Sequence, residues 1–187
     1  MTTEANYSPL RLRKRHTPAK RVDATAADGQ RLVREQSLRG AIASSLLIIV
    51  VFSALWAGLS VLTNRVLPWM TIILGPLLGL AVRRTGRGLD WRFPVIAAVI
   101  TIVGALVGNV IVAAANTAYD LGVGTLQVLR AVTAMTWPIF FAEVMSPADA
   151  IFAMFAAAIA AFYANRRLTR TQFFALKVWQ REQDRGR

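Results

Sequence analysis

Few side chains in this sequence could carry out chemistry. The chain has one histidine, His16, and no cysteine, which removes disulfides, cysteine nucleophiles and thiolate zinc sites. It also lacks HExxH, G-x-S-x-G and a phosphate-cradling loop that ends in Gly-Lys-Ser/Thr. The sequence therefore predicts no catalytic residue, no metal site and no cofactor, and a protein that is not an enzyme.

Two asparagines lie within a long apolar run. Asn109 and Asn116 are seven positions apart, which places them on roughly one face of a helix. They could line a polar path or a ligand site, or they could form interhelical hydrogen bonds, and we favour the hydrogen bonds. Charged residues near the end of that run could bind a partner, but we expect them to be solvated: Asp120, Arg130, Glu143 and Asp149.

Basic residues give the chain a net charge of +12. Such a charge can indicate nucleic acid, but in a membrane protein it is first explained by topology and by anionic lipid head groups. We therefore expect anionic lipids as partners and do not expect nucleic acid. The arginines expected at the membrane surface lie in one loop and at the start of the C-terminal tail: Arg83, Arg84, Arg87, Arg92, Arg166, Arg167 and Arg170.

The elements that hold these residues are expected to be membrane helices. A hydrophobic content of 55% and a mean hydropathy of +0.45 are too high for a soluble domain of this length. Long uncharged runs approach or exceed the roughly 30 Å of a hydrocarbon core. The prediction is an all-α integral membrane helical bundle with four transmembrane helices, at about residues 41–62, 66–82, 93–119 and 149–165.

The segment 121–147 is apolar but interrupted by charge. It contains Arg130 and Glu143, and a charge at mid-bilayer costs roughly 2.5–3.5 kcal/mol. We expect a non-spanning interfacial or re-entrant helix here. Ser146 then reads as a helix N-cap, with Pro147 at the first helical position and Asp149 in the first turn.

Polar tails flank the predicted transmembrane domain, 40–165. Residues 1–39 form a basic N-terminal tail that we expect to be disordered at least to about Ala27. Residues 166–187 are expected to form a basic helix at a membrane surface. Of the 22 Lys and Arg residues, only Arg65 and Arg130 lie outside the tails and the 83–92 loop, so the positive-inside rule places both termini in the cytoplasm.

Small residues occur at helix-packing spacing. Gly104 and Gly108 form a GxxxG pattern, which lets another helix approach closely. The partner could be a second copy of the chain, or internally the second span with Gly75 and Gly79, and we favour the internal partner. Asn109 lies beside this stripe. An alanine-rich face on the last span permits the same two interpretations: Ala156, Ala157, Ala160, Ala161 and Ala164.

Residues 72–165 resemble a loosely defined group of small four-helix bacterial membrane proteins of unassigned function. The resemblance is carried by short motifs and single residues: Gly79-Leu80-Ala81-Val82-Arg83, Gly86-Arg87-Gly88-Leu89-Asp90, Phe93, Gly108-Asn109 and Ser146-Pro147-Ala148-Asp149. It implies four membrane helices preceded by a variable region. It implies no activity.

The sequence thus favours a non-enzymatic protein of a bacterial inner membrane. We expect an accessory or scaffolding subunit that packs against other membrane proteins through its small-residue faces or recruits cytoplasmic partners through its tails. A homo-oligomer is the other association that the small-residue faces permit. The alternative is a small transporter or homo-oligomeric channel that uses the third span and the 121–147 segment. No acidic or basic residue falls inside a clear span, which disfavours transport.

Overall fold

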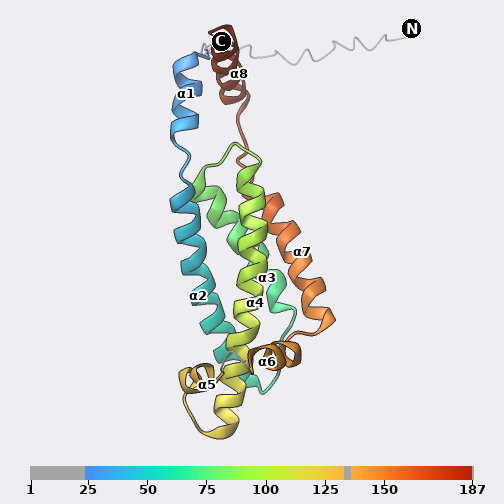
Figure 1. The fold of residues 1–187 in the computed structure, drawn as a ribbon. Coiled ribbons are helices and arrows are strands. Elements are labelled where there is room, and N and C mark those ends of the chain that lie inside the picture. Colours follow the sequence, from blue (N-terminus) through green and yellow to red (C-terminus); the bar gives the residue numbers. More distant parts are fainter. Residues whose placement is uncertain (1–23, 133–135, 187) are drawn as a thin grey trace, which may run out of the picture.

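The computed structural model describes residues 24–132 and 136–186, and this part of the chain is helical without strands. The basic tail was expected over residues 1–39, with disorder at least to about Ala27. Residues 1–23 lie outside the described residues, but a helix begins at Ala26 with Thr25 as its N-cap, so the expected disorder is wrong for Ala26 and Ala27. Figure 1 shows a bundle with a pair of helices beyond one end and two short helices at the other. The bundle helices are α2 (Leu38–Thr63), α3 (Met70–Ala81), α4 (Arg92–Leu121) and α7 (Pro147–Ala164). The remaining helices are α1 (Ala26–Arg34), α5 (Thr125–Ala131), α6 (Trp137–Val144) and α8 (Arg170–Arg185).

Three of the described helices, α2, α4 and α7, are long and apolar enough to cross a membrane. This supports the expectation of a membrane protein. The second predicted span, 66–82, is not among these three. Its helix α3 is shorter than expected, because it has 12 residues and starts at Met70. Pro68 explains the late start, since proline disfavours a helical conformation in the residue before it. The chain continues from α3 into one π-helical turn, Val82–Gly86.

The helix α4 has one exposed face of valines and one buried face of small residues. Val95, Val99, Val103 and Val107 are all exposed and lie four residues apart. Small residues of the same helix, including Gly104 and Gly108, are buried. Since no polar group on the exposed face needs water, this valine stripe fits the hydrocarbon of a bilayer.

The buried glycines set the closest helix approaches. A Cβ on Gly75 would lie 2.5 Å from the carbonyl oxygen of Ala156, and one on Gly79 would lie 2.6 Å from that of Ala160. These glycines of α3 therefore face the alanines of α7, and backbone meets backbone. Removing the side chain from one helix is what allows this approach.

The glycines of α4 have different neighbours from those expected. A Cβ on Gly108 would lie 3.0 Å from the Trp56 ring, and one on Gly104 would lie 2.9 Å from Ile49. Their main neighbours are thus side chains of α2, although Leu74 of α3 also lies 3.3 Å from the Cβ position of Gly104. The two glycines pack inside the bundle, as expected, but they do not face Gly75 and Gly79. The physical reason is side-chain size. The large side chains of α2 fill the space beside the α4 glycines, whereas the α3 glycines pack against the small alanines of α7.

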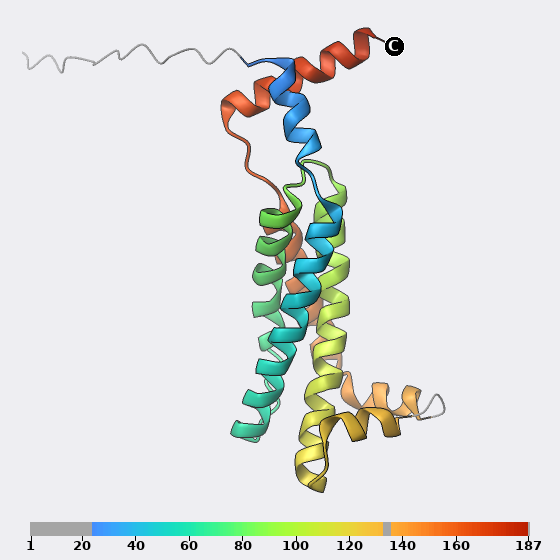
Figure 2. The same cartoon turned by 90° about the vertical axis from the view of Figure 1, so that its left-hand side faces the viewer.

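The segment between α4 and α7 forms two short helices, α5 and α6, which lie across the axis of the bundle (Figure 2). The predicted start of the last helix is confirmed. Ser146 is the N-cap, Pro147 follows it, and the backbone N–H of Asp149 donates to Ser146 Oγ at 3.2 Å. In return the Asp149 carboxylate accepts a hydrogen bond from the Ser146 hydroxyl at 2.6 Å.

Candidate functional site

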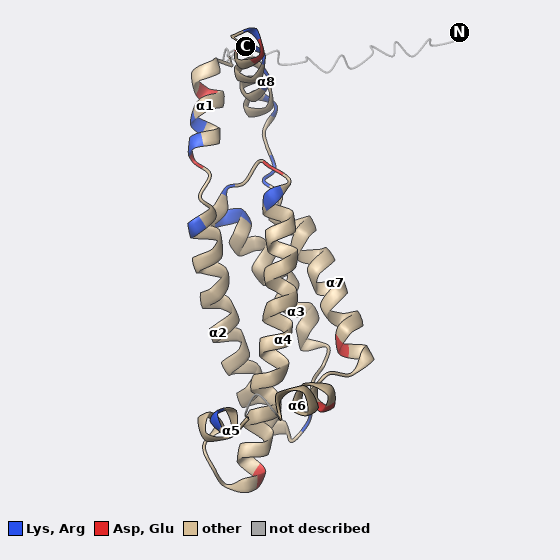
Figure 3. Ribbon diagram, viewed as in Figure 1, with Lys and Arg blue, Asp and Glu red and all other residues tan. Residues whose placement is uncertain are grey.

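Charged residues gather at the end of the bundle that carries α1 and α8, which we call the basic end (Figure 3). The opposite end carries few. Of the arginines predicted at a membrane surface, Arg84, Arg87, Arg92, Arg167 and Arg170 are exposed, while Arg83 and Arg166 are half-buried. The structure thus places all seven around one end, in the π-helical turn, the loop after it, the start of α4 and the segment from α7 into α8.

The helices α1 and α8 pack against each other beyond this end, and we call them the α1–α8 pair (Figures 1 and 2). Their contact is close, because a Cβ on Gly29 would lie 2.5 Å from the carbonyl oxygen of Ala175 and 2.7 Å from Trp179 Cβ. Leu32 and Ala175 are buried in this contact zone. The C-terminal basic helix predicted from the sequence therefore exists, and one of its faces lies against α1.

Both helices of the pair begin with a capping box. The Thr25 side chain accepts a hydrogen bond from the Asp28 backbone, and the Asp28 carboxylate accepts one from the Thr25 hydroxyl at 2.7 Å. This hydrogen bond from Thr25 holds the pKa of the Asp28 carboxyl below its usual range. Thr169 and Gln172 form the same motif at the start of α8. Such boxes satisfy backbone donors that the first helical turn leaves free.

The connection between α1 and α2 is tied to the loop after the π-helical turn. The Ser37 backbone N–H donates to the carbonyl of Gly86 at 2.9 Å, and Gln36 Oε1 accepts a hydrogen bond from Leu89 N at 3.3 Å. Gly88 permits this packing, since a Cβ there would lie 1.9 Å from the Phe93 ring. Arg87, between the two glycines, adopts a left-handed conformation with φ of 47°.

Glu35 stands at the centre of this connection with three arginines around it, and we call these four residues the Glu35 cluster. Glu35 Oε1 lies 3.1 Å from Arg31 Nε, and its Oε2 lies 3.4 Å from Arg87 Nη1 and 3.7 Å from Arg166 Nη1. The arginines come from α1, from the loop before α4 and from the segment after α7. The cluster therefore joins the α1–α8 pair to the bundle at two separate points.

The ion pairs of the cluster differ in burial. The side chain of Arg31 is 80% exposed, whereas those of Arg166 and Glu35 are only 19% and 26% exposed. Exposed ion pairs contribute little, about 0–1 kcal/mol. Arg166 Nη1 is buried and has no hydrogen-bond partner among the described residues, because its distance to Glu35 is longer than a hydrogen bond. Arg166 is thus the least satisfied group of the cluster.

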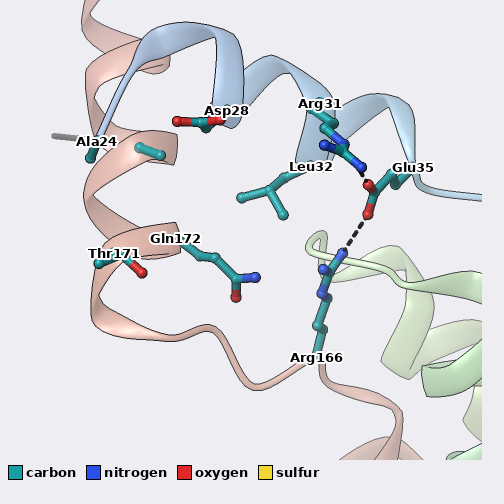
Figure 4. A pocket seen from close by; sticks show the side chains of 9 residues that line it. Ala24, Asp28, Arg31, Leu32, Glu35, Arg166, Thr171 and Gln172 are labelled. Atoms are coloured by element: carbon teal, nitrogen blue, oxygen red, sulfur yellow. Dashed lines mark hydrogen bonds and ion pairs between the residues drawn. The ribbon is translucent and has the colours of Figure 1, made fainter. Parts of the chain in front are cut away.

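A cavity of about 360 Å³ lies between α1 and α8, next to the Glu35 cluster (Figure 4). Figure 4 shows Arg166 reaching up toward Glu35 from one side, and Gln172 and Leu32 reaching in from α8 and α1. The wall combines apolar and polar side chains: Ala24, Asp28, Arg31, Leu32, Glu35, Arg166, Thr171, Gln172 and Ala175. Fixed positive guanidinium groups, a hydroxyl and an amide in one hollow can recognise a small polar ligand.

Comparisons with protein-family models, with curated proteins and with solved structures found no match. The resemblance of residues 72–165 to small four-helix membrane proteins stays a sequence-based expectation.

The structure places the two asparagines in separate contacts. Asn116 Nδ2 donates to Ser60 Oγ of α2 at 3.0 Å, and Asn109 Nδ2 lies 3.7 Å from the sulfur of Met145. Asn109 is buried and Asn116 half-buried. Each therefore has a partner outside α4, and no hydrogen bond joins one asparagine to the other in the described part of the chain.

Neither the α1–α8 pair nor the Glu35 cluster was predicted from the sequence. The start of each helix was readable, since Thr25-x-x-Asp28 and Thr169-x-x-Gln172 fit the capping-box pattern. The pairing of the two helices could not be predicted from the sequence, because their contact depends on Gly29, an isolated glycine with no motif around it.

Proposed function

We propose that this protein is a multi-pass protein of a bacterial inner membrane with four crossing helices, and that it serves as a non-enzymatic accessory or scaffolding subunit. The α1–α8 pair would receive the partner on the cytoplasmic side. The main support for the proposal is this helical pair, which lies beyond the end of the bundle and is joined to it by the ion pairs of the Glu35 cluster.

The pair itself supports a fourth crossing. The helices α1 and α8 lie before the first bundle helix and after the last one, and they contact each other closely at Gly29 and Ala175. Three crossings would leave them on opposite sides of the bilayer, where they could not meet. An even number of crossings is therefore needed, and α3 with its π-helical turn is the segment that packs between α2, α4 and α7.

The orientation follows from charge. The arginines of the basic end lie on the same side as both tails, and the positive-inside rule assigns such a side to the cytoplasm. The short fourth crossing is tolerable, since flanking arginines can extend to the interface and a bilayer can thin locally at modest cost.

The surface of α8 supports partner binding. Phe173 and Phe174 are 46% and 58% exposed on α8, although that helix is polar in most of its length. The Lys177 ammonium lies 4.9 Å from the centre of the Phe173 ring, which gives this patch both aromatic and cationic character. Aromatic residues of this kind are enriched at the centres of protein interfaces.

The interior of the bundle favours a subunit over a transporter. Within the described ranges 24–132 and 136–186, Asp149 is the one buried acidic or basic side chain, and it is engaged in capping α7. Buried hydroxyls such as Ser45 and Thr101 bond to carbonyls of their own helix, at 2.8 and 2.7 Å. Transport pathways usually contain ionisable groups that face a water-filled cavity.

The experiment is purification of the tagged protein from its native membranes in mild detergent, followed by mass spectrometry of stoichiometric partners. We expect a defined complex with another protein. The double variant Phe173→Ser and Phe174→Ser should lose that partner, whereas Trp91→Ser, which alters an exposed aromatic at the basic end outside the pair, should keep it.

A homo-oligomer without another protein would contradict the subunit role and favour the channel alternative. A partner that stays bound in the Phe173 and Phe174 variant would show that the α1–α8 pair is not where it binds.

A further inference from the structure

The α1–α8 pair is joined to the bundle only by narrow connections. Among the described helices, α1 and α8 contact each other and no other helix, the π-helical turn included. The chain passes between the pair and the bundle twice, through residues 35–37 after α1 and residues 165–169 before α8. Figures 1 and 2 show the pair beyond the end of the bundle from two directions. The position of the pair is therefore set at these two connections.

The pair itself is a closely packed unit. A Cβ on Gly29 would lie 2.5 Å from the carbonyl oxygen of Ala175 and 2.7 Å from Trp179 Cβ, so the two helices leave no room for a side chain between them. Leu32 is buried as well. Close packing of this kind resists relative movement of the two helices, and the pair is expected to move as one body.

The two connections differ in how they are held. Directly after Glu35, the chain is bound to the loop before α4: Gln36 Oε1 accepts a hydrogen bond from Leu89 N at 3.3 Å, and Ser37 N donates to Gly86 O at 2.9 Å. The bundle side of this connection thus begins at residue 36. In the other connection, residues 166–169 lie outside any helix or turn. Residues at the ends of elements and in short loops of this kind are where hinges form.

The Glu35 cluster lies where the two connections meet. Glu35 is the C-cap of α1, Arg166 begins the second connection, and Arg87 belongs to the bundle loop. Glu35 Oε2 lies 3.4 Å from Arg87 Nη1 and 3.7 Å from Arg166 Nη1. Ion pairs of this length between partly exposed side chains are weak. They can favour one orientation of the pair without making it permanent.

The backbone at Arg87 gives an independent indication. Its φ is 47°, in the left-handed region that residues other than glycine and asparagine seldom adopt. Gly86 and Gly88 flank it, and a glycine at position 87 would remove the strain at no cost in backbone geometry. What a glycine would lose is the guanidinium group, whose ion pair is with Glu35.

We propose that the α1–α8 pair is a hinged unit. It turns as one body about Glu35 and the 165–169 connection, and the ion pairs of Glu35 with Arg87 and Arg166 hold it in the observed orientation. Breaking these ion pairs releases the pair and changes the position of its exposed α8 surface relative to the bundle. The inference concerns how the pair is held, and it stands whether or not the pair binds a partner.

The test measures two distances by spin labels on introduced cysteines, in full-length protein reconstituted in nanodiscs. Labels at Gln180 and Val95 report the position of the pair relative to α4, and labels at Gln30 and Arg181 report the distance within the pair. All four positions are exposed. In Glu35→Gln we expect the first distribution to broaden and the second to stay narrow. The released population should rise roughly fivefold, the scale of one partly exposed ion pair.

Two further variants separate the ion pairs from other effects. Arg87→Gly relaxes the backbone of the loop, so the loop should stay folded, yet we expect the Gln180–Val95 distribution to broaden as it does in Glu35→Gln. The control is Glu182→Gln, which makes the same charge change at an exposed position of α8 outside the cluster. It should leave both distributions as they are in the unaltered protein.

Three results would overturn the proposal. A Gln180–Val95 distribution that stays narrow in Glu35→Gln or in Arg87→Gly would show that the ion pairs do not hold the pair in place. Broadening of the Gln30–Arg181 distance in Glu35→Gln would show that the pair separates instead of turning as one body. Equal broadening in Glu182→Gln would make the effect one of general surface charge.

Discussion

Single small side chains set the distances between the helices of this protein. At Gly75 and Gly79 the backbones of α3 and α7 approach so closely that a methyl group would collide with a carbonyl oxygen. Gly58 of α2 is the opposite case, since a Cβ there would meet nothing within 4 Å. The same residue type thus has different roles at different positions, which sequence spacing alone does not distinguish.

This difference predicts the outcome of a matched pair of substitutions. Gly79→Ala places a Cβ 2.6 Å from the Ala160 carbonyl oxygen, and overpacking of this kind typically costs about 1–3 kcal/mol. Gly58→Ala should be neutral or stabilising, since alanine exceeds glycine in helix propensity by up to about 1 kcal/mol. The measurement is unfolding in mixed micelles with increasing SDS, followed by circular dichroism. Equal stability of the two variants would contradict the packing described for α3 and α7.

At the scale of elements, the apolar helices were predictable and their neighbours were not. Uncharged runs gave α2, α4 and α7 to within a few residues, because burial in lipid demands an unbroken apolar segment. The shortness of α3 and the partner of Gly104 depend on tertiary packing, which cannot be predicted from a run of apolar residues alone. The Glu35 cluster could not be recognised either, since two of its three arginines, Arg87 and Arg166, lie far from Glu35 in the sequence.

The α1–α8 pair is the element that most needs an independent test. Gly29→Leu should separate the helices, because even a Cβ would lie 2.5 Å from Ala175 O. Overpacking at this small contact, at about 1–3 kcal/mol, corresponds to a roughly 5- to 150-fold shift toward the open form. The measurement is the distance distribution between spin labels on cysteines introduced at Gln30 and Arg181, which are exposed positions in a chain without native cysteine.

The control for this experiment is Ala27→Leu, which adds the same side chain to an exposed position of α1. We expect a narrow distance distribution in the unaltered pair and in the Ala27 variant, and a broad one in the Gly29 variant. A narrow, unchanged distribution with leucine at 29 would mean that α1 and α8 do not meet through this face.

At the scale of the whole molecule, the pairing of the first and last described helices constrains how the chain threads the membrane. Three helices qualify as spans by length and composition, yet contact between α1 and α8 requires an even number of crossings. In the proposed topology α3 and its π-helical turn make the fourth crossing, and α1 and α8 then lie on the side of the arginines. The proposed scaffolding role depends on this arrangement.

The direct test of this arrangement is labelling of single introduced cysteines with a membrane-impermeant maleimide. The positions are Ala27 in α1, Gln180 in α8 and Thr125 in α5, with Thr125 as the control at the opposite end of the bundle. In intact cells with a permeabilised outer membrane, we expect Thr125 to react and Ala27 and Gln180 to stay unlabelled; in inverted inner-membrane vesicles the pattern should reverse. Labelling of Ala27 and Gln180 from opposite sides would contradict four crossings and the α1–α8 pair together.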